Sequence, residues 1–259
     1  MGAVIAISGK GGTGKSTLSA ALIHGLVSAG DGPVLAVDAD HNASLGLLLG
    51  LDVDGTISDI RDQTREAAQR VTEIPKERLV DQWLNEIVVE ASGYDLIAMG
   101  RPEGPGCYCY VNSLLRRYLA TLRRSYPFVV IDNAAGMEHL SRLTSDDVQL
   151  LVLVSEPTYV GLTTVLRINE LADSLPIKIG RRVLVINKIG PEGLAPKAVE
   201  VAESVTVDAR IQIPLSEPLA RLSVTGEGVT PESVSEVAEP VGELLEQCRE
   251  AAGSTASRS

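Results

Sequence analysis

Short, almost purely apolar runs alternate along the chain with longer segments in which apolar residues recur at helical spacing. Runs built from Val, Ile, Leu and Ala are typical of parallel strands that are buried on both faces. Their alternation with helices predicts an α/β fold, a single doubly wound and mainly parallel sheet of about seven or eight strands flanked by helices. The predicted strands are residues 3–8, 33–38, 94–98, 127–132, 148–154, 181–186 and 208–213.

The pattern shows no internal repeat and no linker, so residues 1–252 are predicted to form one domain. Residues 55–92 have the weakest pattern and are assigned to helical cover. Residues 240–252 predict a last amphipathic helix. Residues 253–259 are small and polar, and we expect them to be a disordered tail.

A glycine-rich loop follows the first predicted strand: residues 9–16, Gly-Lys-Gly-Gly-Thr-Gly-Lys-Ser, match G-x-x-x-x-G-K-[ST]. Strand, loop and helix together place backbone N–H groups around phosphate oxygens at the positive end of the helix dipole. The motif predicts a P-loop NTPase, in which Lys15 contacts the β- and γ-phosphates and the Ser16 hydroxyl ligates Mg²⁺. The predicted nucleotide-binding residues of the loop are Gly11, Gly12, Thr13, Gly14, Lys15, Ser16 and Thr17.

Acidic residues close two of the predicted strands. Asp38 and Asp40 follow the second strand, and Asp132 ends the strand at 127–132, as in a Walker B motif. Because ligands gather beyond the carboxyl ends of parallel strands, these acids are expected beside the P-loop. There they favour a role in holding Mg²⁺, directly or through water, and in positioning water. Each is also explained as a helix N-cap or a turn residue.

A second lysine, Lys10, lies early in the loop. Its side chain could reach the nucleotide of a neighbouring subunit and neutralise charge during phosphoryl transfer, as an arginine finger does. The alternative is an exposed loop residue without a catalytic role.

Two of the three cysteines, Cys107 and Cys109, are one residue apart in a Gly/Pro-rich loop. A disulfide across one residue is geometrically awkward, whereas two adjacent thiolates suit a soft or borderline metal ion. A closed thiolate site takes four ligands, which a two-fold dimer would supply from two such pairs. The alternative is a pair of ordinary, small apolar cysteines.

The formal net charge of -11 argues against nucleic acid or an anionic membrane as a partner. The last predicted helix is acidic, with four glutamates against one arginine in residues 239–250, unlike a basic membrane-binding helix. The chain begins directly with a strand, which leaves no room for a cleaved signal, so we expect a cytoplasmic location. In that compartment the three cysteines should be reduced thiols.

Several motifs resemble those of one ATPase family. Residues 10–16 resemble the "deviant" Walker A motif of the family that includes MinD, ParA and the nitrogenase iron protein. Residues 38–40 resemble its switch I, and residues 132–136 its Walker B motif and switch II. Residues 185–188, Val-Ile-Asn-Lys, resemble its adenine-recognition strand end, and residues 213–217, Ile-Pro-Leu-Ser-Glu, its second base-contacting loop.

This resemblance implies ATP rather than GTP, and an ATP-driven homodimer that places Lys10 across the interface. It implies that Asp40 orients the attacking water and that Asn187 contacts adenine. The further base contacts it implies are Pro214, Leu215 and Glu217. Two departures from the family pattern, His41 in place of proline and Ala134 in place of an acidic residue, bear on the rate of hydrolysis.

The loop at 99–115 closely resembles that of the CooC-type ATPases, accessory proteins for nickel insertion into carbon monoxide dehydrogenase. This resemblance implies an Mg²⁺-dependent ATPase that forms a dimer, in which the Cys107 and Cys109 pairs of the two subunits share a metal. It also implies that carbon monoxide dehydrogenase is the client. Nickel follows from the resemblance alone, since thiolates bind zinc at least as readily. The alternatives are a positioning or partitioning switch like MinD or ParA, and an iron–sulfur ATPase like the nitrogenase iron protein.

Overall fold

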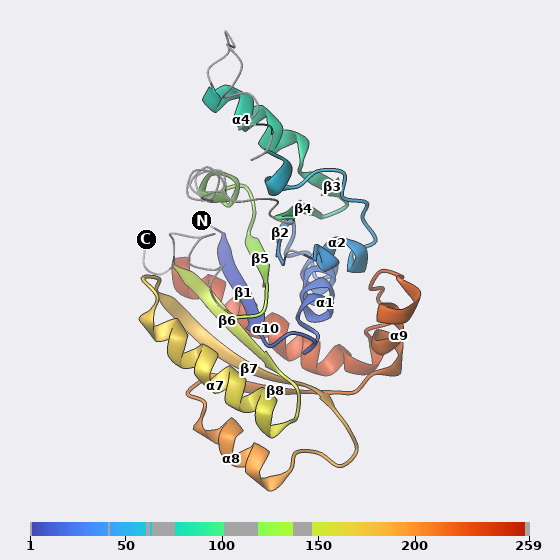
Figure 1. Cartoon of the computed structure of the whole chain (residues 1–259), viewed down its shortest axis with the longest axis vertical. Helices are drawn as coiled ribbons and strands as arrows, with labels where there is room; N and C mark the ends of the chain where they lie inside the picture. The colour runs from blue at the N-terminus through green and yellow to red at the C-terminus, as the bar shows by residue number, and fades with distance from the viewer. Residues whose placement is uncertain are drawn as a thin grey trace.

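A computed structural model describes residues 2–40, 42–60, 63, 76–100, 119–136 and 147–256. Its strands form one sheet in the order β3-β4-β2-β5-β1-β6-β7-β8 (Figure 1). All neighbouring strands are parallel except β3 and β4. The strands are β1 (Ala3–Gly9), β2 (Val34–Ala39), β3 (Val89–Ala91), β4 (Tyr94–Ala98), β5 (Phe128–Asn133), β6 (Val148–Ser155), β7 (Ile179–Ile189) and β8 (Ala209–Pro214).

Helices cover both faces of the sheet (Figure 1). Alternate side chains of a strand point to opposite faces, so β1 places Ile5 and Ile7 in one buried cluster and Val4 and Ala6 in the other. The first cluster packs against α1 and α10, and the second against α7 and α8. The helices are α1 (Lys15–Ser28), α2 (Ser44–Leu48), α4 (Lys76–Glu86), α7 (Tyr159–Ser174), α8 (Pro196–Ser204), α9 (Glu217–Thr225), the 3₁₀-helix η1 (Ser235–Val237) and α10 (Ala238–Ala256).

The predicted fold class is confirmed. Every predicted strand is present, because short runs rich in apolar residues are a clear signal of strands in a parallel sheet. The assignment of residues 55–92 to helical cover is wrong in part, since the edge strand β3 lies there and pairs with β4. β3 has three residues, of which the outer two are half-buried and Glu90 is exposed, so it carries too little apolar pattern to be recognised.

The end of the chain also needs a correction. Helix α10 continues to Ala256, four residues past the predicted helix end at residue 252. Ala251 and Cys248 are buried against the sheet, which anchors the last turns. Residues 253–256 are therefore helical instead of belonging to a disordered tail, and residues 257–259 lie outside the described ranges.

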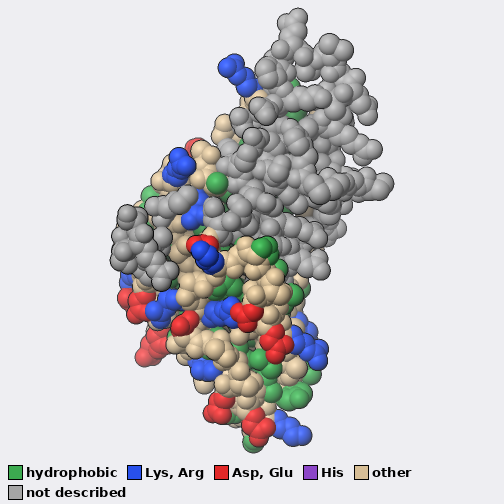
Figure 2. Space-filling model, turned by 90° about the vertical axis from the view of Figure 1, so that its left-hand side faces the viewer, with side chains coloured by type: hydrophobic (Ala, Val, Ile, Leu, Met, Phe, Trp, Pro, Cys, Tyr) green, Lys and Arg blue, Asp and Glu red, His purple; other side chains and the backbone are tan. Residues whose placement is uncertain are grey.

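Across the described helices, none combines the length and apolar character that crossing a membrane requires. On the face shown in Figure 2, Lys and Arg side chains are interspersed with Asp and Glu side chains over the described surface. That face of the described chain therefore presents charges of both signs.

Candidate nucleotide-binding site

The loop between β1 and α1 has a backbone that requires glycine. Gly12 and Gly14 have φ values of 83° and 90°, the left-handed region that side chains disfavour. A Cβ on Gly14 would lie 2.5 Å from the Asn187 Nδ2, and a Cβ on Gly9 would lie 2.2 Å from the Val154 carbonyl oxygen. Glycine at these positions allows the loop to wrap tightly over the ends of β6 and β7.

A cavity of about 620 Å³ opens above this loop, within the usual size of a cofactor site. Its walls are the P-loop, the segment after β2, the end of β7 and the start of α9, so it lies at the carboxyl edge of the sheet as predicted. Thr13 is buried behind it. The lining residues are Gly11, Gly12, Gly14, Lys15, Ser16, Thr17, Asp40, Asn42, Ser44, Leu48, Lys188, Leu215, Ser216, Leu219 and Ala220.

Lys15 lies at the floor of this cavity. Burial lowers the pKa of its ammonium, and the carboxylates of Asp132 and Asp40 partly oppose that effect. The Lys15 Nζ donates to the Lys10 carbonyl oxygen at 3.2 Å, and that oxygen also accepts from the Thr13 hydroxyl at 2.9 Å. A largely buried ammonium bound to a shared neutral carbonyl is suited to a stronger anionic acceptor such as a phosphate.

Two buried acids face the loop from neighbouring strands. Asp38 on β2 and Asp132 on β5 are register partners. Burial, together with the charge of Asp132, raises the pKa of Asp38 to about 7. Burial raises the pKa of Asp132 to about 6 against the opposing effects of Ser16 and Lys15. Two carboxylates so placed repel each other, and a cation between or beside them would relieve that repulsion.

The oxygen atoms of these acids differ in their contacts. Both oxygens of Asp38 accept backbone N–H groups, from Asp40 at 3.1 Å and from Leu45 at 2.8 Å, which holds the loop after β2 as a turn residue does. Asp132 accepts the Ser19 hydroxyl at 3.1 Å with Oδ1, whereas its buried Oδ2 has no hydrogen-bond partner.

These contacts test whether the site suits Mg²⁺. The unpartnered Asp132 oxygen and the Ser16 hydroxyl, which the Ser44 hydroxyl contacts at 3.1 Å, are hard oxygen ligands of the kind Mg²⁺ takes. The residues therefore fit Mg²⁺, which Ser16 and Asp132 would hold. Both oxygens of Asp38 already accept backbone N–H groups, so Asp38 would act through water.

The remaining predicted residues are placed as follows. Asp40 faces the cavity and accepts from the backbone and side chain of Asn42. The side chain of Lys10 is exposed, so it points away from the interior. Asn133, after the Walker B acid, donates from Nδ2 to the Ile7 carbonyl at 3.0 Å and to Ser8 at 3.2 Å, tying β5 to β1. His41 lies outside the described residues.

At the predicted base end, Asn187 contacts the protein itself. Its Nδ2 donates to the Thr13 carbonyl oxygen at 2.9 Å, and its Oδ1 accepts from the Lys188 N–H at 2.9 Å. Leu215 lines the cavity, whereas Pro214 ends β8 and is not among the lining residues. The role of Asn187 in reading adenine stays a prediction.

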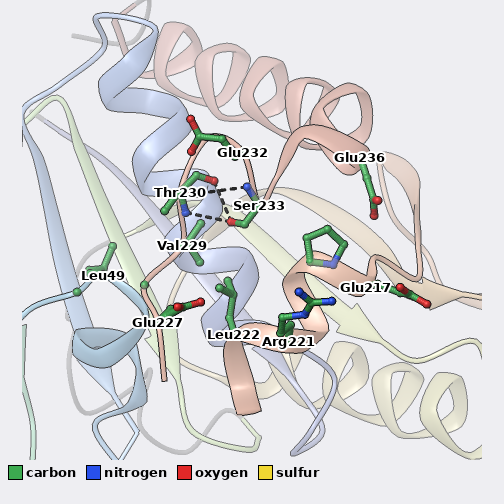
Figure 3. A pocket seen from close by; sticks show the side chains of 13 residues that line it. Leu49, Glu217, Arg221, Leu222, Glu227, Val229, Thr230, Glu232, Ser233 and Glu236 are labelled. Atoms are coloured by element: carbon green, nitrogen blue, oxygen red, sulfur yellow. Dashed lines mark hydrogen bonds between the residues drawn. The ribbon is translucent and has the colours of Figure 1, made fainter. Parts of the chain in front are cut away.

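Glu217 lines a different cavity, of about 780 Å³, on the other side of α9 (Figure 3). Figure 3 shows it together with Arg221, Leu222 and Val229. Sequence reasoning therefore missed the α9 residues that do face the P-loop, as well as Lys188. The missed lining residues are Asn42, Ser44, Leu48, Lys188, Ser216, Leu219 and Ala220.

The predicted thiolate site cannot be placed, because Cys107 and Cys109 lie outside the described residues. In the ranges that are described, no three His, Cys, Asp or Glu side chains are grouped to hold a metal ion. Cys248 is free and lies on the buried face of α10. Metal binding by the cysteine pair stays a prediction.

Several known proteins have similar sequences. An uncharacterized ATP-binding protein of Methanocaldococcus jannaschii is 42% identical over 193 residues, 73% of this chain and 76% of that protein. The carbon monoxide dehydrogenase accessory protein CooC of Rhodospirillum rubrum is 35% identical over 188 residues, 67% of this chain and 70% of that protein.

Solved structures show the same fold. The cell division ATPase MinD of Pyrococcus furiosus superimposes with a TM-score of 0.69 at 24% identity, covering 96% of this chain and 99% of that one. MinD of Pyrococcus horikoshii, solved with Mg-ADP, gives 0.64 at 21% identity, with 96% of each chain covered. Residues 4–229 match the family described as the CobQ/CobB/MinD/ParA nucleotide binding domain. With the glycine loop, the buried lysine and the strand-end acids in place, the chain belongs to this nucleotide-binding family.

Proposed function

We propose that this protein is an Mg²⁺-dependent ATPase that dimerises around nucleotide and a shared metal, and that it delivers nickel for the maturation of carbon monoxide dehydrogenase. The observation that carries ATP hydrolysis is the P-loop cavity, which is lined by Lys15, Ser16 and Asp40. The carboxylate of Asp132 lies close enough to Lys15 to act on the pKa of its ammonium. The CooC relative and the Cys107–Cys109 pair support the delivery of metal.

In the proposed reaction the oxygen of a water molecule attacks the γ-phosphorus of ATP. The bond to the β–γ bridging oxygen breaks, and the products are ADP and phosphate, with the water proton passing to phosphate or solvent. Asp40, which faces the cavity, orients the water, and Lys15 binds the phosphate oxygens. Bound Mg²⁺ would supply positive charge beside the β- and γ-phosphates.

Lys10 would act from the second copy of the chain. Its exposed side chain leaves the loop instead of entering its own cavity, as an intersubunit role needs. The ammonium would neutralise charge on the partner's γ-phosphate. Full ATPase activity and ATP-dependent dimerisation in a Lys10→Ala chain would contradict this role.

The metal would be cargo held between two copies. Each chain contributes Cys107 and Cys109, so a dimer supplies the four thiolates of a closed site. Nucleotide binding would favour the dimer and assemble the site, and hydrolysis would release it. The two events are thereby coupled through dimerisation.

The test is an anaerobic titration of reduced protein with Ni²⁺, with and without an ATP analogue, followed by metal content and molecular mass. We expect one metal per dimer in the wild type and none in a Cys107→Ser/Cys109→Ser chain. Cys248→Ala is the matched control, because this thiol is buried on the inner face of α10, and the variant should retain the metal.

Other outcomes would refute metal delivery. Absence of cysteine-dependent metal in every nucleotide state would leave a dimerising ATPase switch of the MinD or ParA kind, for which co-sedimentation with liposomes or DNA in ATP is the next assay. A brown chain with visible absorption after anaerobic purification would instead support an iron–sulfur cluster on the same thiolates.

A further inference from the structure

The turn at the end of β7 contacts the P-loop through the side chain of Lys188. Lys188 has φ 62°, a left-handed conformation that is rare for a residue with a side chain. It lies where the pairing of β7 with β8 shifts register. From there its Nζ donates to the Gly12 carbonyl oxygen at 2.5 Å and lies 3.5 Å from the Glu156 Oε1. The left-handed conformation of Lys188 therefore places its ammonium in contact with the P-loop.

Three carbonyl groups of the loop are fixed by donors. The Lys10 oxygen accepts from the Thr13 hydroxyl, the Gly12 oxygen from Lys188, and the Thr13 oxygen from Asn187. In a planar trans peptide the C=O and the following N–H point in opposite directions. A donor that fixes one of these carbonyl groups therefore also points the N–H of the following residue in the opposite direction. The N–H groups directed in this way are those of Gly11, Thr13 and Gly14.

We propose that Lys188 is a positioning residue, which prepares the P-loop for phosphate by fixing the Gly12–Thr13 peptide, with Glu156 as its counter-charge. The proposal deepens the proposed function, since it rests on nucleotide binding at this loop. Donors fixed before the ligand arrives need no reorganisation when it binds. Loss of the ammonium lets this peptide rotate, and its carbonyl dipole can then face the phosphates.

The two contacts of the ammonium differ in weight. A hydrogen bond from a charged donor is stronger than one between neutral groups. Both contacts are exposed to water, but the hydrogen bond to Gly12 is short at 2.5 Å, whereas the ion pair is longer at 3.5 Å and is screened, with 40% of the Lys188 side chain and 35% of the Glu156 side chain accessible. The contact with Gly12 therefore carries the effect, and Glu156 contributes little to binding.

The experiment compares ADP with pyrophosphate, which has phosphates but no base, in competition with a fluorescent ADP. In Lys188→Met, which keeps the methylene stem, we expect the affinity for both to fall about tenfold, equivalent to about 1.4 kcal/mol. Lys188→Arg, which keeps a charged donor, should rescue most of the loss. Lys197→Met, an exposed lysine on α8, is the matched control and should bind as the wild type does.

Turnover gives a second readout. Because Lys188 acts on the empty loop, Lys188→Met should raise the KM for ATP and leave kcat at saturation close to that of the wild type. A merely structural role would lower the amount of folded enzyme, which would reduce kcat and the thermal midpoint without nucleotide instead of raising KM.

Four results would overturn the inference. One is equal affinity in wild type and Lys188→Met; another is a loss for ADP with none for pyrophosphate, which would assign Lys188 to the base. A third is a loss in Glu156→Gln as large as in Lys188→Met, which would assign the effect to the ion pair. The fourth is a loss of kcat without a change of KM. Failure of the wild-type chain to bind ADP or ATP would refute the proposed function as well.

Discussion

Replacing Asp132 by asparagine should stabilise the nucleotide-free protein and weaken its response to magnesium. The side chain is fully buried and its Oδ2 has no hydrogen-bond partner, so its charge is held at a cost. Asparagine has nearly the same shape and can still accept the Ser19 hydroxyl. The substitution therefore removes the charge with little change in packing.

The magnitude follows from the pKa of Asp132, which burial raises from 3.8 to about 6. At about 1.4 kcal/mol per pH unit, this difference is about 3 kcal/mol, an upper value that already includes the attraction of Lys15. Because the folded pKa lies above the unfolded one, the cost is absent below pH 3.8. It grows as the pH rises from 3.8 to about 6 and is complete above that window.

The assay is urea unfolding of both chains in EDTA without nucleotide, from pH 4 to pH 8. Asp132→Asn should match the wild type near pH 4 and exceed it by about 1–3 kcal/mol at pH 8. With Mg²⁺ and ADP the order should reverse, because the variant has lost a holder of the cation. The exposed Asp52→Asn is the matched control and should follow the wild type throughout.

A variant that is no more stable than the wild type at pH 8 would refute the reasoning about burial. A variant that is stabilised by Mg²⁺ and ADP as much as the wild type would refute the assignment of Asp132 to the cation. The two results are independent, so the electrostatic argument and the functional argument are tested separately.

Two further predictions concern α1 and its contacts. Leu22→Ala should lower the free energy of unfolding, measured with urea, by about 2–5 kcal/mol, since Leu22 is 0% exposed. Leu171→Ala, at a position that is 46% exposed, should lower it much less. Equal losses in the two variants would contradict the packing argument. Burial lowers the pKa of His24, whose ring meets Tyr94 edge-on, so its neutral form adds stability that is lost as the pH falls below 6.5. Urea unfolding at pH 7.5 and 5.5 should show a smaller loss in His24→Gln than in the wild type, and parallel losses would contradict the effect.

Much of the sheet and of the P-loop could be predicted from the sequence because both depend on local signals. A strand buried on both faces must be apolar at most positions, as β1 and β6 are. The loop must have glycine where φ is positive, as at Gly12 and Gly14. The edge strand β3 has neither signal: it is short, half-buried and defined only by its partner β4.

At the predicted base-binding end of the site, the sequence motif predicted only some of the residues that line the cavity. The motif pointed to Glu217, but α9 turns that residue and Arg221 toward the second cavity. Ser216, Leu219 and Ala220, spaced by three and four residues, share the face toward the P-loop. Helical spacing could have separated the two faces, but only tertiary packing decides which of them meets the nucleotide site.

Asp38 and Asp132 show why similar motifs can carry different roles. Each ends a strand, and the two are register partners, so their sequence context is nearly the same. The loop after β2 folds back and gives both oxygens of Asp38 a backbone N–H, whereas Asp132 keeps one oxygen unpartnered. Which acid is available to a cation thus depends on the path of the following loop, and the strand ends do not encode it.

The site as a whole is costly to fold without a ligand. Burial lowers the pKa of Lys15 and raises the pKa of Asp38 and Asp132, so each would hold its charge more easily in water. A phosphate would give the ammonium an anion, and a divalent cation would give the carboxylates a counter-charge. Because one magnesium nucleotide supplies both, its binding would offset the cost of burying the ammonium and the cost of burying the carboxylates together. Natural proteins retain unfavourably buried charges of this kind where function requires them, and here these charges lie around the P-loop.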